Sequence, residues 1–142
     1  MVAVVWFAML GWALALSFAD LRERRLPNVL TIPGAAVILA GATVAGRGAA
    51  AMAGGLGLAA VYLVVHLAQP RGMGAGDVKL ALGLGAVTGA FGVGVWTIAA
   101  LGAPALSAAF GAASAVRGGS RAVPHGPSMC LVSLIAVVVA ML

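Results

Sequence analysis

The chain has 142 residues, of which 63% are hydrophobic and 8% are charged. Soluble domains usually carry about 25% charged residues, so this composition excludes an ordinary water-soluble domain. It predicts a single all-α domain over residues 1–142, a polytopic membrane bundle of about six transmembrane helices. The net charge of +5 comes from scattered residues without interleaved aromatic residues, so we expect no nucleic-acid partner.

Uncharged runs follow one another along the chain, and polar breaks separate them. A helix needs roughly 20 apolar residues to cross a membrane. The predicted spans are residues 1–19, 29–46 and 49–68, two helices within 80–116, and 127–142. We place the turn of the long run near Thr88 and Gly89, with Gly92 and Gly94 close by. The first span begins without basic residues, which argues against a cleaved signal peptide.

Basic residues gather in alternate polar breaks. The first, third and fifth breaks hold Arg22, Arg24, Arg25, Arg71, Lys79, Arg117 and Arg121, and the other side holds only Arg47. Positively charged loops stay in the cytoplasm, so we expect the N-terminus outside. This pattern predicts a multi-pass protein of the inner (cytoplasmic) membrane, whose basic loops contact lipid head groups.

The three acidic residues are Asp20, Glu23 and Asp77. Glu23 lies among arginines, and we interpret it as a solvated surface charge. Asp20 and Asp77 lie at the cytoplasmic ends of two predicted spans, where an ionisable group needs water, a partner or a function. Before their flanking residues are considered, two interpretations stay open: interfacial acids that neutralise nearby arginines, or a catalytic pair.

Both aspartates have distinctive neighbours. Residues 74–77 form a GxGD motif, in which the glycines permit a turn or a close backbone approach. Residues 20–28 contain an aspartate, an arginine two positions later, and a Leu-Pro-Asn triplet. Together they resemble the type IV prepilin peptidase family, membrane aspartic proteases with D-x-R-x-x-x-I-P-N and GxGD-x-K elements. Lys79 matches the lysine, Leu26 replaces the isoleucine, and residues 123–127 resemble the family's late proline-glycine-proline segment.

The resemblance implies an aspartic endopeptidase that removes the leader of a prepilin-like substrate at the cytoplasmic membrane face. It assigns Asp20 and Asp77 as the catalytic pair that activates water. The supporting residues that it implies are Gly74, Gly76, Lys79, Arg22, Pro27 and Asn28. The partner would be a prepilin-like protein with an apolar helix.

The chain is similar to the short forms of the family, such as those that serve Flp or Tad-type pili. Long forms carry a cytoplasmic methyltransferase segment with paired cysteines, which the single Cys130 cannot supply. We therefore expect no such segment. No His, Cys and acid cluster points to a metal, and we expect no cofactor.

Two other functions stay open. Asp20 and Asp77 could be proton or cation sites of a small membrane transporter subunit, or the chain could be a structural assembly protein with a degenerate protease fold. Helix direction places Asp20 at a negative helix end and Asp77 at a positive one. The dipoles alone thus favour an ionised Asp77 and a protonated Asp20, although nearby arginines oppose this. We interpret His125 as a polar interfacial residue rather than a proton carrier. We expect His66, near the cytoplasmic end of the third span, to snorkel or to form an interhelical hydrogen bond.

Overall fold

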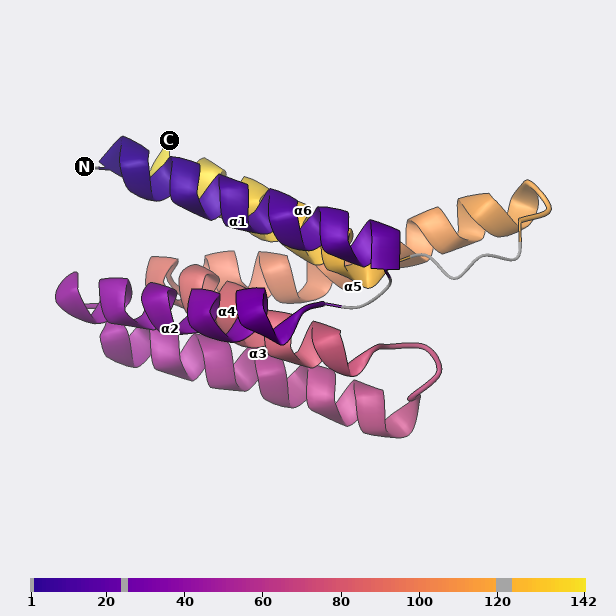
Figure 1. Ribbon diagram of the computed structural model, residues 1–142, viewed down its shortest axis with the longest axis horizontal. Helices are drawn as coiled ribbons and strands as arrows, with labels where there is room; N and C mark the ends of the chain where they lie inside the picture. Colours follow the sequence, from indigo (N-terminus) through magenta and orange to yellow (C-terminus); the bar gives the residue numbers. More distant parts are fainter. Residues whose placement is uncertain (1, 24–25, 120–123) are drawn as a thin grey trace.

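The structure is a computed structural model that describes residues 2–23, 26–119 and 124–142, with only the backbone described for residues 2–8. The described residues form six helices and no strand, which confirms the predicted all-α bundle (Figure 1). The helices are α1 (Val2–Glu23), α2 (Asn28–Val44), α3 (Gly48–Ala68), α4 (Ala75–Phe91), α5 (Val93–Val116) and α6 (His125–Met141). Helices α3 and α5 are long and apolar enough to cross a membrane, and α2 and α6 are shorter apolar helices.

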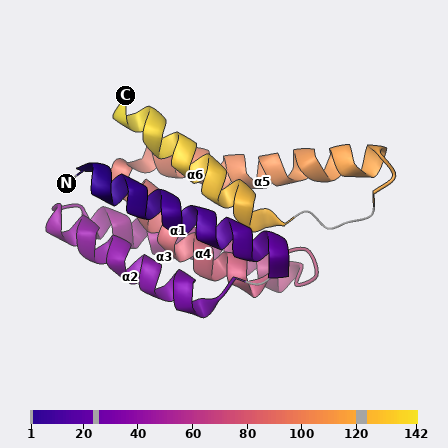
Figure 2. The same cartoon turned by 45° about the horizontal axis from the view of Figure 1, so that its top comes forward.

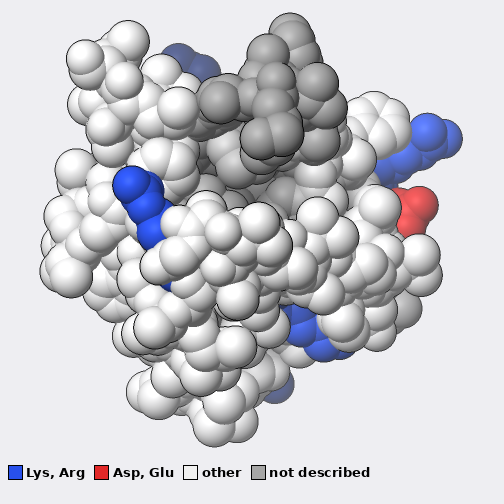
Figure 3. All heavy atoms as spheres, turned by 90° about the vertical axis from the view of Figure 1, so that its left-hand side faces the viewer, with Lys and Arg blue, Asp and Glu red and all other residues white. Residues whose placement is uncertain are grey.

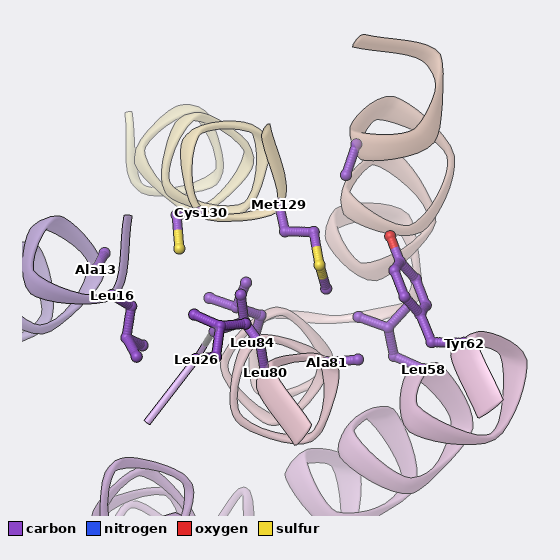
Figure 4. Packing of buried hydrophobic residues seen from close by; sticks show 11 residues of the cluster. Ala13, Leu16, Leu26, Leu58, Tyr62, Leu80, Ala81, Leu84, Met129 and Cys130 are labelled. Carbon is purple, nitrogen blue, oxygen red and sulfur yellow. The ribbon is translucent and has the colours of Figure 1, made fainter. Parts of the chain in front are cut away.

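Helix α4 is the central helix of the bundle. It packs against α2, α3, α5 and α6, and its side chains are buried almost continuously from Leu80 to Gly89. Helix α1 packs mainly on α6 at the side of the bundle, as two views agree (Figures 1 and 2). Residues from α1, α3, α4 and α6 meet in the core (Figure 4).

Small residues allow α3 and α4 to approach closely. A Cβ atom added at Gly85 would lie 2.5 Å from the Gly54 carbonyl oxygen, and one at Gly89 would lie 2.8 Å from the Ala50 carbonyl oxygen. Neither neighbour can move aside, because both are backbone atoms of a packed helix. Gly85 and Gly89, one helical turn apart, therefore pack α4 closely against α3.

The turn between α4 and α5 lies later than predicted. Thr88 is fully buried inside α4, where its hydroxyl donates to the Leu84 carbonyl at 2.8 Å, and Gly89 packs on Gly54. The chain turns at Gly92, whose φ of 116° is open to glycine and strained for other residues. The prediction of a turn at Thr88 and Gly89 was wrong because a glycine can serve a close helix contact as well as a turn.

The connections between α1 and α2, α3 and α4, and α5 and α6 lie at one end of the bundle (Figure 1). The turns from α2 to α3 and from α4 to α5 lie at the opposite end, near both termini. Seen from that opposite end, most of the surface is uncharged (Figure 3). Arg24, Arg25 and Arg121, which contributed to the predicted charge pattern, lie outside the described residues, as does Val123 of the late motif.

Candidate active site

Asp20 lies in the last turn of α1, and its side chain is only 7% exposed. The backbone N–H of Gly126, in the first turn of α6, donates to Asp20 Oδ2 at 3.1 Å. The first N–H groups of a helix lack partners within that helix, so the carboxylate acts as a cap supplied by another helix. A Cβ atom at residue 126 would lie 2.6 Å from the same oxygen, so the contact requires glycine.

Asp77 lies in the first turn of α4 and is also 7% exposed. The Asp77 N–H donates to the Gly74 carbonyl at 3.1 Å, and Gly74 precedes the helix in an extended conformation. Neither Gly74 nor Gly76 has a positive φ, so the expected glycine-specific turn is absent here. Gly76 instead permits a close approach: a Cβ atom there would lie 3.0 Å from Leu26 Cβ. Gly76 of the GxGD motif therefore packs closely against Leu26 of the other predicted motif.

Asp20 and Asp77 line one cavity of about 620 Å³ at the end of the bundle that carries the longer connections. Four of the six predicted supporting residues line it as well: Asn28, Gly74, Gly76 and Lys79. The other two do not. Arg22 is exposed and lies over the Phe18 ring, and Pro27 precedes α2 as its N-cap. The cavity also includes Leu26, Pro70, Arg71, Gly72, Met73, Ala75, Pro124 and His125.

The two carboxyl groups lie beyond the predicted apolar spans, and burial perturbs both. Burial, and after it the charge of Asp20, raise the pKa of Asp77 to about 6, although the Gly74 backbone and His66 act in the opposite direction. Burial also raises the pKa of Asp20, whereas the Gly126 N–H lowers it. The N–H group that Gly126 donates to Asp20 stabilises the ionised form of this carboxyl group, which favours a shared proton on Asp77.

This order is the reverse of the one that the helix dipoles predicted. That prediction considered only the helix to which each aspartate belongs. In the structure the N-terminus of α6 points an N–H group at Asp20, and this positive end opposes the negative end of α1. Asp77 is in addition buried beside a second carboxylate.

A side-chain hydrogen bond connects the two motifs at the rim of the cavity. Lys79 Nζ donates to Asn28 Oδ1 at 2.7 Å, although the residues are 51 positions apart. The lysine belongs to the GxGD-x-K element and the asparagine ends the other element. Their contact gives these two residues a shared role in holding α2 beside α4.

Two histidines join helices and loops around the cavity. His66 Nδ1 donates to the Met73 carbonyl at 2.7 Å and so ties the connection before α4 to the end of α3. The His125 ring forms hydrogen bonds with Tyr62 and Ser107. Tyr62 and Ser107 were not predicted as site residues, because their sequence signal is no more than a polar group inside an apolar run. No group of three potential metal ligands occurs among the described residues.

Comparisons with known proteins agree with this geometry. The sequence model of the type IV leader peptidase family matches residues 7–142, nearly the whole chain. No match was found among curated proteins, and none among solved structures.

Proposed function

Because the chain belongs to the type IV leader peptidase family, it is a peptidase, and we propose that it is an aspartic endopeptidase that uses Asp20 and Asp77. The observation that carries the proposal is the cavity in which both carboxyl groups are buried together. They are the only two aspartates of the chain, and they lie 57 positions apart in the sequence, on different helices. A pair of carboxyl groups with one proton supplies both a base and an acid for amide hydrolysis.

The reaction begins with a water molecule between the carboxyl groups. Ionised Asp20 accepts a proton from the water, whose oxygen attacks the carbonyl carbon of the substrate peptide bond. Protonated Asp77 donates its proton to the carbonyl oxygen, which gives a neutral tetrahedral diol. Asp20 then returns a proton to the amide nitrogen, Asp77 takes one from the diol, and the C–N bond breaks to give an acid and an amine.

The substrate that we propose is a prepilin-like protein with a short leader followed by an apolar helix. The position of the cavity supports this, because it lies at the polar end of a bundle whose helices expose many large apolar side chains. The leader would reach the cavity from water while the apolar helix stays in lipid. We also propose that leader removal occurs without N-methylation of the product, as in the short forms that the chain resembles.

The membrane orientation is a further part of the proposal. Arg71 and Lys79 line the cavity, Arg22 lies in the last turn of α1 and Arg117 directly follows α5 at the same end of the bundle, whereas Arg47 lies at the other end. Positive charge stays in the cytoplasm, so this distribution supports an inner-membrane protein with its N-terminus outside and its active site facing the cytoplasm.

Cleavage of a prepilin-like peptide by purified protein in detergent tests the activity. We expect Asp20→Asn and Asp77→Asn each to lower kcat by at least about 10³-fold, since each removes a proton acceptor or donor in the reaction. Glu23→Gln is the matched control and should cleave normally. Near-normal turnover in either aspartate variant contradicts the dyad, and proton flux into vesicles without any cleavage favours the transporter.

Labelling of single cysteines tests the orientation. Cys130 is buried, so it gives little background, and new cysteines at Gly72 and Ala45 occupy exposed connections at opposite ends. In intact spheroplasts, an impermeant maleimide should label Ala45→Cys and should label Gly72→Cys only after lysis. The reverse pattern would place the cavity outside the cell.

A further inference from the structure

Both ring nitrogens of His125 are engaged by side chains from other helices. His125 Nε2 lies 3.0 Å from the Tyr62 hydroxyl of α3, and His125 Nδ1 lies 2.6 Å from the Ser107 hydroxyl of α5. A neutral imidazole donates through one nitrogen and accepts through the other, and either arrangement satisfies both hydroxyl groups. The ring of His125 is therefore held from two sides.

The hydrogen bond to Tyr62 joins helices that do not pack directly on each other. In the described part of the chain, α6 packs on α1, α4 and α5, whereas α3 packs on α2, α4 and, slightly, α5. Tyr62 is 2% exposed and its ring extends from α3 past Leu58 into the core, with its hydroxyl pointing away from α3 (Figure 4). The first turn of α6 is thus anchored to α3 through the His125 side chain.

That same first turn holds Asp20. Gly126 directly follows His125, and its N–H donates to Asp20 Oδ2 at 3.1 Å. A fixed His125 ring limits the movement of the adjacent backbone, and a carboxylate oriented by one N–H group is sensitive to small shifts of that group. His125 lines the same cavity as both aspartates, so its hydrogen bonds to Tyr62 and Ser107 act at the candidate active site.

We propose that Tyr62, His125 and Ser107 form a relay that positions the Gly126 N–H group, and through it the Asp20 carboxylate, for catalysis. The three are positioning residues, since they act through Gly126. The proposal rests on the proposed function for its kinetic consequence, but the contact that it describes exists independently of cleavage.

The position of the Gly126 N–H can be measured through the titration of Asp20. A hydrogen bond to the ionised form lowers the pKa of a carboxyl group, as Gly126 does for Asp20, so a displaced Gly126 raises it. The other titratable and charged groups near the two aspartates and the relay are Asp77 and Lys79 on α4, Tyr62 and His66 on α3, Arg71 in the connection before α4, and His125 and Cys130 on α6. None of these charges is removed by deleting a neutral hydroxyl at neutral pH.

The experiment uses the full chain in detergent with ¹³C-labelled aspartate carboxyl groups. The chain contains only two aspartates, so the spectrum holds two carboxyl resonances, and Asp20→Asn assigns them. In Tyr62→Phe and in Ser107→Ala we expect the Asp20 midpoint to move upward by roughly half a pH unit or more. Ser107→Thr keeps the hydroxyl and should titrate as the original protein does. Thr97→Val is the control on α5, because the Thr97 hydroxyl donates to the Val93 carbonyl of its own helix.

Cleavage kinetics of the same variants provide the second measurement. Tyr62→Phe and Ser107→Ala should each lower kcat by about 3- to 10-fold with little change in KM, and the acid limb of the pH profile should move upward. Unchanged titration of Asp20, or a uniform loss of activity at all pH values without movement of the acid limb, overturns the relay. A protein that titrates as expected but cleaves no prepilin-like peptide contradicts the proposed function instead.

Discussion

The two ends of the bundle are closed in different ways. At the end near the termini, backbone bonds close both turns, and the Arg47 side chain also donates to the Ala90 carbonyl at 3.3 Å. At the cavity end, backbone bonds occur within the connections as well, but the cavity-lining residues Lys79 and Asp20 themselves make contacts between helices, with Asn28 and Gly126. Changes at the cavity end should therefore affect catalysis more than stability, and changes between the ends should do the opposite.

Among changes that keep both aspartates, the largest effect is expected from Gly126→Ala. The new Cβ atom would lie 2.6 Å from Asp20 Oδ2, so the carboxylate or the first turn of α6 must shift. We expect kcat to fall by roughly 100-fold, because a small displacement of a catalytic group is costly, while the thermal midpoint changes little. Gly94→Ala is the control at the other end, where a Cβ atom meets nothing within 4 Å. Normal cleavage by Gly126→Ala would contradict the prediction that catalysis is sensitive to changes at the cavity end.

The middle of the bundle should respond to Gly85→Ala with a loss of stability. A Cβ atom there would press on the Gly54 carbonyl oxygen of a packed helix, and overpacking of this kind costs about 1–3 kcal/mol. Unfolding in mixed micelles measures the free energy. Gly11→Ala, whose Cβ atom meets nothing within 4 Å, should be neutral. If both variants unfold alike, the close contact between α3 and α4 does not stabilise the fold.

The pH dependence of kcat/KM should follow the ionisation of Asp77, which lies at the cavity end. With the pKa of Asp77 near 6, the free enzyme loses the shared proton as pH rises through this value. We expect kcat/KM to fall about tenfold per pH unit above about 6, since this ratio reports the free enzyme. Arg47→Met, at the far end, should leave the profile in place. A flat profile between pH 5 and 8 would contradict a proton shared by the dyad.

The smallest effect is expected from Lys79→Met. It removes one exposed hydrogen bond, to Asn28, and should lower cleavage by about 3- to 5-fold. Asn28→Ala should have a similar effect, and the double variant should be no worse than either single one, because both remove the same contact. Additive losses in the double variant would show that the two residues act separately.

Much of this organisation could be predicted from the sequence, because membrane helices are long apolar runs and acids are rare among them. Asp20 and Asp77 stood out for that reason, and their flanking residues suggested a role for each. The turn was placed at Gly89 and not at Gly92, because a glycine in an apolar run can mark either a turn or a close helix contact. In the structure Gly89 makes the contact and Gly92 makes the turn. Tyr62 and His125 meet across 63 residues, and no spacing within either helix indicates that they meet. The Asp20–Gly126 contact spans 106 residues and likewise exists only in the folded bundle.

That last contact sets an order of events during biogenesis. A chain emerging from the ribosome inserts α1 to α5 with both carboxyl groups already present, but the amide that orients Asp20 comes with α6. Before α6 packs against α1, the proposed dyad therefore lacks the contact that orients Asp20. We expect the proposed site to reach its working geometry only once α6 has docked.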